Sequence, residues 1–177
     1  MRAMPTVQPV TADELEAAVP ILSELLRESV GADASLGFLP PLSTRQAREY
    51  WLSLKAPLAA GSRVLLAASL DGRIVGSGQL SLASQSNARH RATLEKLFIQ
   101  ASSRGRGIGK LLVAALEDAA RRHGRKLLLL GARRHDPAEA FYRRLGYQEY
   151  GIIPGYSQDA GGRLHDNVCF YRELGID

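Results

Sequence analysis

Hydrophobic side chains recur along this chain at two spacings, one typical of helices and the other typical of strands. The first helical stripe consists of Leu15, Val19, Leu22, Leu25 and Leu26. These positions repeat every three or four residues, which predicts a helix with one apolar face. Thr11 and Glu14 precede the stripe with the spacing of a capping box, and Ser43 and Gln46 repeat that spacing. A second helix is therefore predicted after Ser43, ending near Pro57.

Apolar runs bounded by polar or turn-forming residues predict strands. The predicted strands are residues 7–10, 64–70, 74–82, 93–99, 127–130, 147–152 and 168–174. Asp71-Gly72 is a strong hairpin signal between two of them. Residues 84–91 are polar and residues 153–165 are rich in glycine, so both segments are expected to be loops.

Two more helices are predicted in the second half of the chain. Apolar residues follow the helical spacing over residues 108–119, and Gly124 marks the end of that helix. Asp136-Pro137 has the N-cap and first-turn residues of another helix, which Gly146 follows as a C′ residue.

The predicted elements follow the order strand, helix, helix, strand, strand, strand, helix, strand, helix, strand, strand. A crossover helix between two central strands implies that these strands are parallel, with antiparallel hairpins on either side. The predicted fold class is therefore α/β with a mixed sheet. A length of 177 residues without repeats or a long linker predicts one domain, residues 1–177.

Composition narrows the expected surroundings and partners. No apolar run approaches the roughly 20 residues of a membrane span, and the first residues lack a signal-peptide core, so no membrane partner is expected. The single cysteine, Cys169, is typical of a reducing compartment, which predicts a cytoplasmic location. The net charge is +5, but the cations are scattered, so no nucleic-acid partner is predicted. The excess of positive charge is instead compatible with a polyanionic cofactor.

The sharpest chemical signal lies between a predicted strand and a predicted helix. The segment consists of Arg104, Gly105, Arg106, Gly107, Ile108, Gly109 and Lys110. Glycines let successive N–H groups close around an anion, and the helix start adds free donors and a positive dipole end. The three cations add charge, so the segment predicts a pyrophosphate site. The alternative is a tight turn with solvated arginines.

Two common nucleotide-binding loops do not match this segment. A Walker loop needs Ser or Thr after Lys110, where Leu111 stands, and a glycine where Arg104 stands. A dinucleotide fold needs a third glycine in place of Lys110 and an acidic residue near the end of the next strand, where Gly131 stands. Neither loop is predicted, and no metal site is predicted.

The remaining pattern, Gln/Arg-x-x-Gly-x-Gly/Ala, resembles the GNAT superfamily of N-acetyltransferases. The resemblance includes Leu97-Phe98-Ile99 on the preceding strand and residues 138–147, which are similar to the family's second cofactor motif. It implies central parallel strands that splay apart and acetyl-CoA as co-substrate. A closer resemblance, to the tabtoxin-resistance acetyltransferases, rests on the segments 35–38, 154–156 and 162–165.

The resemblance also implies roles for individual residues. The pantetheine arm of acetyl-CoA would pair with the backbone from Leu97 to Ile99, and an N–H group there would stabilise the oxyanion. Tyr142 matches the tyrosine that protonates the leaving thiolate; the alternative is a core aromatic beside Phe141. His135 opens the second motif and is expected to line the cofactor.

The general base is less clearly marked. Many members of the family carry a glutamate at the position of Thr93, and relatives of the tabtoxin group tend to carry an aspartate at the position of Gly131. Glu95 faces the same side of the strand as Thr93, so it could act as the base directly or through water, or be a structural carboxylate. His165 and Asp166 are further candidates.

The predicted function is acetylation of an amine on a small molecule, by direct attack in a ternary complex, with detoxification of an amino-bearing compound as one role. A protein or peptide N-acetyltransferase and a non-catalytic acetyl-CoA sensor remain as alternatives. The sequence leaves the acceptor and the oligomeric state open, with a homodimer as one outcome.

Overall fold

The computed structural model describes residues 4–175, which contain a seven-stranded mixed sheet. The strands are β1 (Thr6–Pro9), β2 (Arg63–Leu70), β3 (Arg73–Leu82), β4 (Arg91–Ile99), β5 (Leu127–Arg133), β6 (Gln148–Gln158) and β7 (Leu164–Glu173). The helices are α1 (Leu15–Gly31), α2 (Thr44–Ser53), α3 (Lys55–Ala59), α4 (Ile108–Arg122) and α5 (Pro137–Arg144), with a 3-10 turn, η1, at Ala101–Ser103. The strand order is β1-β2-β3-β4-β5-β7-β6. None of the helices within residues 4–175 has the length and apolarity that a membrane crossing requires.

Side-chain hydrogen bonds close a turn before the first helix and cap the start of the second. The Thr11 N–H group donates to Glu14 Oε2 at 3.0 Å, and the Glu14 N–H group donates to Thr11 Oγ1 at 3.3 Å. Ser43 and Gln46 form a complete capping box at the start of α2. The predicted capping box at Ser43 is therefore present, and it satisfies N–H groups that α2 leaves without partners. The Thr11–Glu14 pair instead closes a turn before α1, whose N-cap is Glu14 without a side-chain capping bond, so Thr11 is not the N-cap that the sequence predicts.

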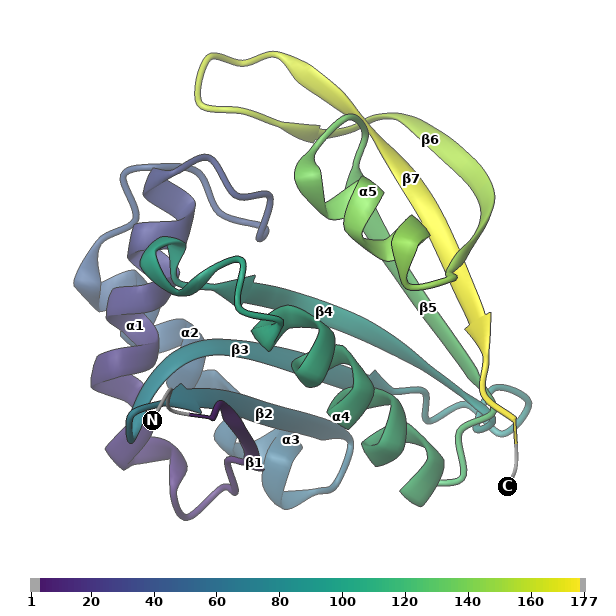
Figure 1. Ribbon diagram of the computed structural model, residues 1–177, viewed down its shortest axis with the longest axis horizontal. Helices are drawn as coiled ribbons and strands as arrows, with labels where there is room; N and C mark the ends of the chain where they lie inside the picture. The colour runs from purple at the N-terminus through teal and green to yellow at the C-terminus, as the bar shows by residue number, and fades with distance from the viewer. Residues whose placement is uncertain (1–3, 176–177) are drawn as a thin grey trace.

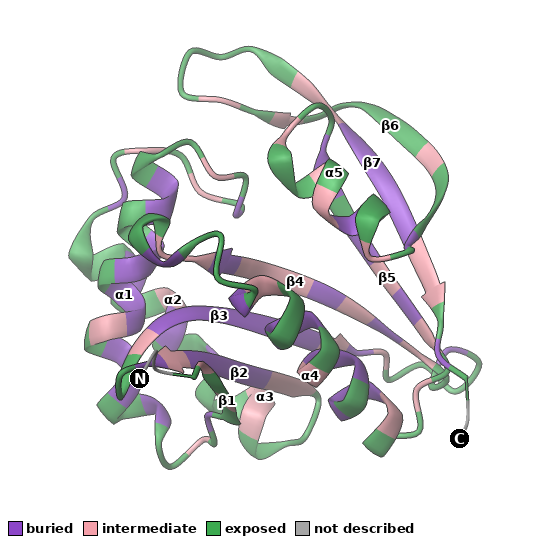
Figure 2. Cartoon of the chain, in the orientation of Figure 1, coloured by how far each residue is buried: buried purple, intermediate pink, exposed green. Residues whose placement is uncertain are grey.

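Two hydrophobic cores lie on opposite faces of the sheet, and the mostly buried β3 separates them (Figure 1, Figure 2). α1 and α2 cover one face, where Trp51 is fully enclosed, and α4 and α5 cover the other face. Neighbouring residues of β2 alternate between the two cores, as the period of a strand requires: Leu65 belongs to the first and Leu66 to the second. The predicted apolar stripe of α1 is buried throughout.

The two central strands are parallel and separate soon after they meet. Their paired residues are Arg91–Leu127, Ala92–Leu128 and Thr93–Leu129. Beyond these pairs β4 continues along β3, whereas β5 continues along β7, so the strands diverge towards their C-terminal ends (Figure 1). The splay of the central strands is therefore confirmed, and it leaves the second half of β4 with one edge unpaired.

A β-bulge interrupts β4 beside this gap. The residue pairs on either side of it are Gln79–Glu95 and Ser77–Phe98. Between these pairs β4 has two residues, Lys96 and Leu97, where β3 has Gly78 alone. Lys96 adopts a φ of 52°, in the left-handed region. The extra residue resets the alternation of side chains in the rest of the strand.

Some parts of the chain depart from the sequence prediction. The second predicted helix, expected to end near Pro57, ends at Ser53, and a separate short helix, α3, contains Pro57. The sequence does not predict η1. Residues 153–165, expected to be a loop, instead extend β6 and β7 into a hairpin whose turn spans residues 159–163. Asp159 Oδ1 holds this turn by accepting the N–H groups of Gly161 and Arg163 at 2.9 and 3.0 Å. The glycines therefore serve the turn of a hairpin and do not mark an irregular loop.

The core under α4 can be tested with two adjacent leucines. Leu112 is fully enclosed, whereas Leu111 is 39% exposed. We expect Leu112→Ala to lower the free energy of unfolding by about 2–5 kcal/mol, because it leaves a cavity. The control Leu111→Ala should cost less than about 1 kcal/mol. Urea unfolding followed by the fluorescence of Trp51, the single tryptophan, measures both, and equal losses would contradict this packing.

Candidate active site

The glycine-rich segment lies between β4 and α4 and presents bare backbone to its surroundings. Gly105 and Gly107 have φ values of 74° and 77°, which side-chain-bearing residues rarely adopt. A Cβ atom added at either position would have no atom within 4 Å, so both positions face open space. Gly107 is the N-cap of α4, and its carbonyl accepts the first helical hydrogen bond, from Leu111, at 3.0 Å.

Positive charge gathers at the start of α4. The first N–H groups of a helix have no carbonyl partner within it, and the dipole makes this end positive. Arg106 and Lys110 are exposed here and make no ion pair within the described residues. Arg104 instead donates from Nε to the Ile99 carbonyl at 3.1 Å. Arg106 and Lys110 are therefore available to bind an anion, whereas Arg104 is hydrogen-bonded to the end of β4.

The last residues of β4 run beside the gap between the central strands. The Gln100 N–H group donates to the Val75 carbonyl on β3 at 2.7 Å. Since backbone groups of successive residues point to alternate edges of a strand, the N–H and C=O groups of Ile99 point towards the gap. The Phe98 ring turns away and packs 6.3 Å from the Trp51 ring in the core under α1 and α2.

Gly109 allows α5 to pack closely against the start of α4. A Cβ atom at Gly109 would lie 3.3 Å from Cζ of Phe141, so the phenylalanine ring rests almost directly on the helix backbone. Ile108 is buried in the core on this face of the sheet, and Leu97 packs against that core. These contacts hold the anion-binding segment and the second predicted motif side by side.

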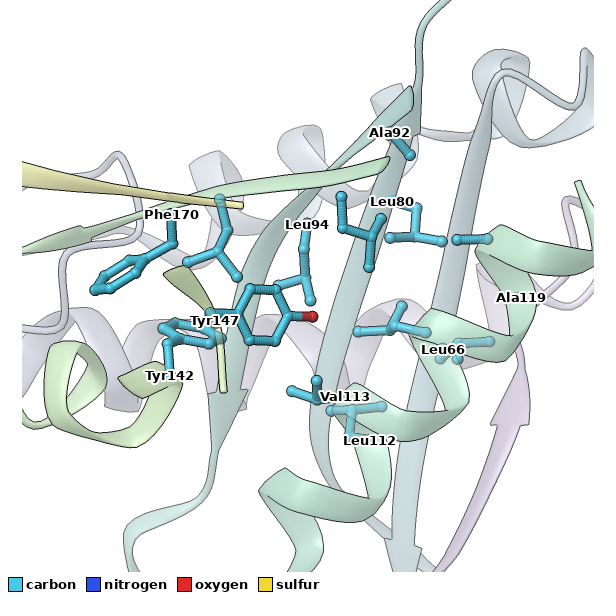
Figure 3. Close-up of a cluster of buried hydrophobic side chains, with 14 of the residues drawn as sticks. Leu66, Leu80, Ala92, Leu94, Leu112, Val113, Ala119, Tyr142, Tyr147 and Phe170 are labelled. Carbon is cyan, nitrogen blue, oxygen red and sulfur yellow. The ribbon is translucent and has the colours of Figure 1, made fainter. Parts of the chain in front are cut away.

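Tyr142 projects from α5 into the same core (Figure 3). Its ring packs edge-on against Phe141 and Tyr147, with centroids 5.2 and 5.6 Å apart, and lies 6.4 Å from Phe170. Burial raises the pKa of the Tyr142 phenol above its ordinary value. The phenol is therefore neutral at physiological pH, and the same burial makes it a weaker acid than an exposed tyrosine.

Glu95 lies on β4 just beyond the last pairing with β5. Its Oε2 atom accepts a hydrogen bond from Arg63 Nη1 at 2.9 Å, and the same nitrogen donates to Gln79 Oε1 at 2.9 Å. Gln79 Nε2 donates in turn to the Tyr50 hydroxyl at 2.8 Å. The Glu95 side chain is 34% exposed, so the network fixes the carboxylate and leaves it within reach of a ligand.

His135 and Asp136 lie at the start of α5. His135 is exposed, has a φ of 68°, and donates its backbone N–H group to Glu139 Oε2 at 2.6 Å. Asp136 has the backbone geometry of an N-cap, but its side chain makes no capping hydrogen bond, contrary to the prediction. It faces Arg133 instead, at 3.8 Å, and burial raises the pKa of its carboxyl group.

An ion pair that the sequence does not predict bridges the two sides of the gap. Arg133, at the end of β5, donates to Asp33 Oδ2 at 2.8 Å and to the Asp33 carbonyl at 3.3 Å. Asp33 belongs to the loop between α1 and α2 and has a φ of 61°. The pair therefore connects that loop to the far arm of the sheet. No local pattern marks it, because the two residues are 100 positions apart.

The remaining polar candidates lie on the C-terminal arm. A Cβ atom at Gly131 would lie 2.5 Å from Asn167 Nδ2, so the buried Asn167 amide covers the backbone of β5 there. His165 Nε2 lies within hydrogen-bond distance of Asp159 Oδ2, at 2.8 Å, inside the β6–β7 hairpin. Asp166 pairs with Arg134, after β5, at 3.3 Å, and its Oδ1 atom accepts the Gly155 N–H group of β6 at 3.1 Å. Both side chains are therefore engaged in contacts on the C-terminal arm.

Comparisons with known proteins agree with this arrangement. The model of the acetyltransferase (GNAT) family matches residues 27–147. An uncharacterized N-acetyltransferase from the hisH-hisA intergenic region of Azospirillum brasilense is 32% identical over 63% of this chain and 66% of its own length. An IAA acetyltransferase from the same organism is 29% identical over 88% of this chain and 94% of its own. The solved structure of yncA from Salmonella typhimurium, with its cofactor acetyl-CoA, has a TM-score of 0.79 at 18% identity, covering 98% of this chain and 95% of that one.

The two free cations at the start of α4 give a direct test of the anion site. We expect the double variant Arg106→Ala, Lys110→Ala to bind acetyl-CoA about tenfold more weakly or worse, because it loses charged hydrogen-bond donors. Arg122→Ala, about 20 Å away at the other end of α4, is the control and should bind normally. Isothermal titration calorimetry measures both. The difference should shrink at high ionic strength, and equal affinities at low salt would reject the site.

Proposed function

Since the chain belongs to the acetyltransferase (GNAT) family and is an acetyl-CoA-dependent acyltransferase, we propose that it acetylates an amine of a small molecule by direct attack in a ternary complex. The observation that carries this proposal is the splay of β4 and β5 directly beside the glycine-rich start of α4. The unpaired edge of β4 in the gap can pair with an extended ligand. The glycine-rich start of α4, at the open end of the gap, can bind a pyrophosphate. Acetylation would remove the charge of the amine, which suits a detoxifying role.

The residues around the gap fit acetyl-CoA. Gly105 and Gly107 leave room for phosphate oxygens, and Arg106 and Lys110 would neutralise their charge. The Ile99 backbone would pair with the pantetheine arm, and His135 stands exposed where it would line the cofactor. Acetyl-CoA supplies the activated thioester. The backbone N–H groups on the free edge of β4 would then stabilise negative charge that develops on the carbonyl oxygen.

Glu95 is the proposed general base. An alkylamine with a pKa near 10 is only about one part in a thousand neutral at pH 7, so a group that removes its proton speeds the attack. Glu95 lies where β5 has just left β4, and its carboxylate is held by Arg63 and partly exposed. It would take the proton directly or through one water molecule.

Tyr142 is the proposed general acid. Burial raises the pKa of its phenol, so the proton stays on the oxygen across the neutral and alkaline range. The residue would pass this proton to the sulfur as the thiolate leaves. The same burial penalises the charged phenolate, so the residue would regain its proton from solvent after each turnover.

The surroundings of the gap favour a small acceptor over a protein. The Asp33–Arg133 pair ties the loop between α1 and α2 across one side of the gap, which narrows the approach for a folded protein or a long peptide. The relative named IAA acetyltransferase, which aligns with 88% of this chain, also favours this class. Within the family, the segments 35–38, 154–156 and 162–165 favour the tabtoxin-resistance group.

The proposed reaction is tested by following coenzyme A release with a thiol reagent. The acceptor panel contains amino acids, dipeptides, polyamines, aminoglycosides and short peptides. Release that depends on one class of small amine supports the proposal. Release with peptides alone would move the function to a protein N-acetyltransferase. If acetyl-CoA raises the melting temperature but no acceptor causes release, the chain is a sensor of acetyl-CoA.

The role of Tyr142 predicts the behaviour of Tyr142→Phe. We expect its kcat to fall about a hundredfold or more, since a general acid contributes at least that factor, while its affinity for acetyl-CoA stays normal. Tyr171→Phe, whose hydroxyl donates to Gln148 at the surface, is the matched control and should keep full activity. A normal kcat for Tyr142→Phe would make Tyr142 a packing residue only.

The role of Glu95 predicts a pH-dependent defect in Glu95→Gln. At pH 7 we expect a loss of about a hundredfold in kcat, with unchanged acetyl-CoA affinity. The loss should narrow as the pH rises towards the pKa of the amine, because more of the amine is then neutral without help. Glu49→Gln, on the exposed side of α2, is the control. A defect that stays constant from pH 7 to 10 would argue against the base.

A further inference from the structure

The bulge in β4 changes the direction in which Lys96 points. In a regular strand neighbouring side chains point to opposite faces, so Lys96 would lie on the α4 face if Glu95 lies on the α2 face. The extra residue of the bulge removes this alternation at Lys96. Both side chains therefore lie against α2: Glu95 joins the Tyr50 network, and Lys96 Nζ lies 5.9 Å from the centre of the Tyr50 ring.

The Lys96 ammonium group occupies a half-buried, mostly aromatic site. Its nitrogen lies over the rings of Phe38 and Tyr50, which pack edge to face with centroids 5.2 Å apart. A Cβ atom at Gly37 would lie 2.9 Å from this nitrogen, so a glycine there, with a φ of 81°, gives it room. Burial lowers the pKa of the Lys96 amine, which shows that the charge is incompletely solvated.

The charge of Lys96 is not balanced by the protein. Within residues 4–175 its ammonium group makes no ion pair and no hydrogen bond. The carboxylate that acts electrostatically on Lys96, that of Glu95, is already held by Arg63 at 2.9 Å. Two cations and one anion therefore meet at this point of β4. A left-handed lysine also costs about 1–2 kcal/mol of backbone energy, and strain of this kind is concentrated at functional sites.

We propose that Lys96 recognises an anionic group on the acceptor, so that the substrate is an amine that also carries a carboxylate, as an α-amino acid does. This inference rests on the proposed function and names its substrate class. The amine of such an acceptor would lie beside Glu95, and its carboxylate would supply the missing counter-charge at Lys96. A half-buried, weakly solvated ammonium group binds an anion more strongly than one in bulk water. Polyamines, which carry only positive charge, would be repelled by the same site.

The experiment compares acceptors that differ in the carboxylate alone. Coenzyme A release is measured for a series of L-amino acids and for the α-carboxamide of each, with spermidine as a purely cationic amine. We expect each accepted amino acid to have a kcat/KM about tenfold to a hundredfold above that of its amide, the range of one charged hydrogen bond. Converting the carboxylate to an amide makes the amine less basic, so a larger fraction of the amide is neutral and able to react. A preference for the amino acid would therefore have to outweigh this chemical advantage of the amide.

Two variants assign the preference to Lys96. Lys96→Met keeps the length of the side chain, and we expect it to raise KM for the amino acid about tenfold or more, with little change in KM for the amide. Lys96→Arg keeps the charge and should retain most of the preference. Melting temperatures with and without acetyl-CoA identify variants that fail to fold. The comparison of amino acids with their amides in the unmodified protein does not depend on these variants.

The outcomes separate this inference from the function on which it rests. If the amides or spermidine are acetylated as well as the amino acids, or if Lys96→Met leaves the ratio of acid to amide unchanged, the role of Lys96 is overturned while the acetyltransferase stands. If acetyl-CoA binds and no amine of any kind is acetylated, the proposed function falls, and the inference falls with it.

Discussion

The early end of the pairing between β4 and β5 is the constraint on which the rest of the molecule depends. Three residue pairs join the strands, and then each strand follows a different neighbour. An unpaired edge in the middle of a sheet leaves backbone groups without partners, which is costly unless something else satisfies them. Arg104 meets part of this need by donating to the Ile99 carbonyl, and the remaining groups are available to a ligand.

The gap is held open by contacts on both sides of the sheet. On the α4 side, the Phe141 ring rests on Gly109 and fixes the distance between α5 and the start of α4. On the other side, the Asp33–Arg133 ion pair connects the loop after α1 to the end of β5. Both contacts are made by the protein's own residues. The fold itself therefore positions the binding groups, which reduces the entropy that binding has to overcome.

Local signals in the sequence predicted most of the local structure, and the errors came from side-chain contacts and backbone conformations that no residue pattern marks. The capping box at Ser43 involves residues three positions apart and is present as predicted. Thr11 and Glu14 also form hydrogen bonds at this spacing, but they close a turn, and α1 begins after it with Glu14 as its N-cap. Asp136 has equally good local signals, but Arg133 draws its side chain away from the helix start. The side-chain direction of Lys96 could not be predicted from the sequence either. No residue type in β4 indicates a bulge, and lysine rarely adopts a positive φ. The glycine-rich segment was readable because glycine itself is the marker.

The contact between Gly131 and Asn167 has a consequence for how this protein can evolve. A carboxylate at position 131 would stand on β5, the strand that faces β4 across the gap, but any side chain there meets the Asn167 amide within 2.5 Å of its first carbon. Substitution at position 131 therefore requires the Asn167 side chain to move. A smaller residue at position 167 would clear the space. The effect of a carboxylate at position 131 is thus expected to depend on the residue at position 167, which makes the order of the two mutations matter.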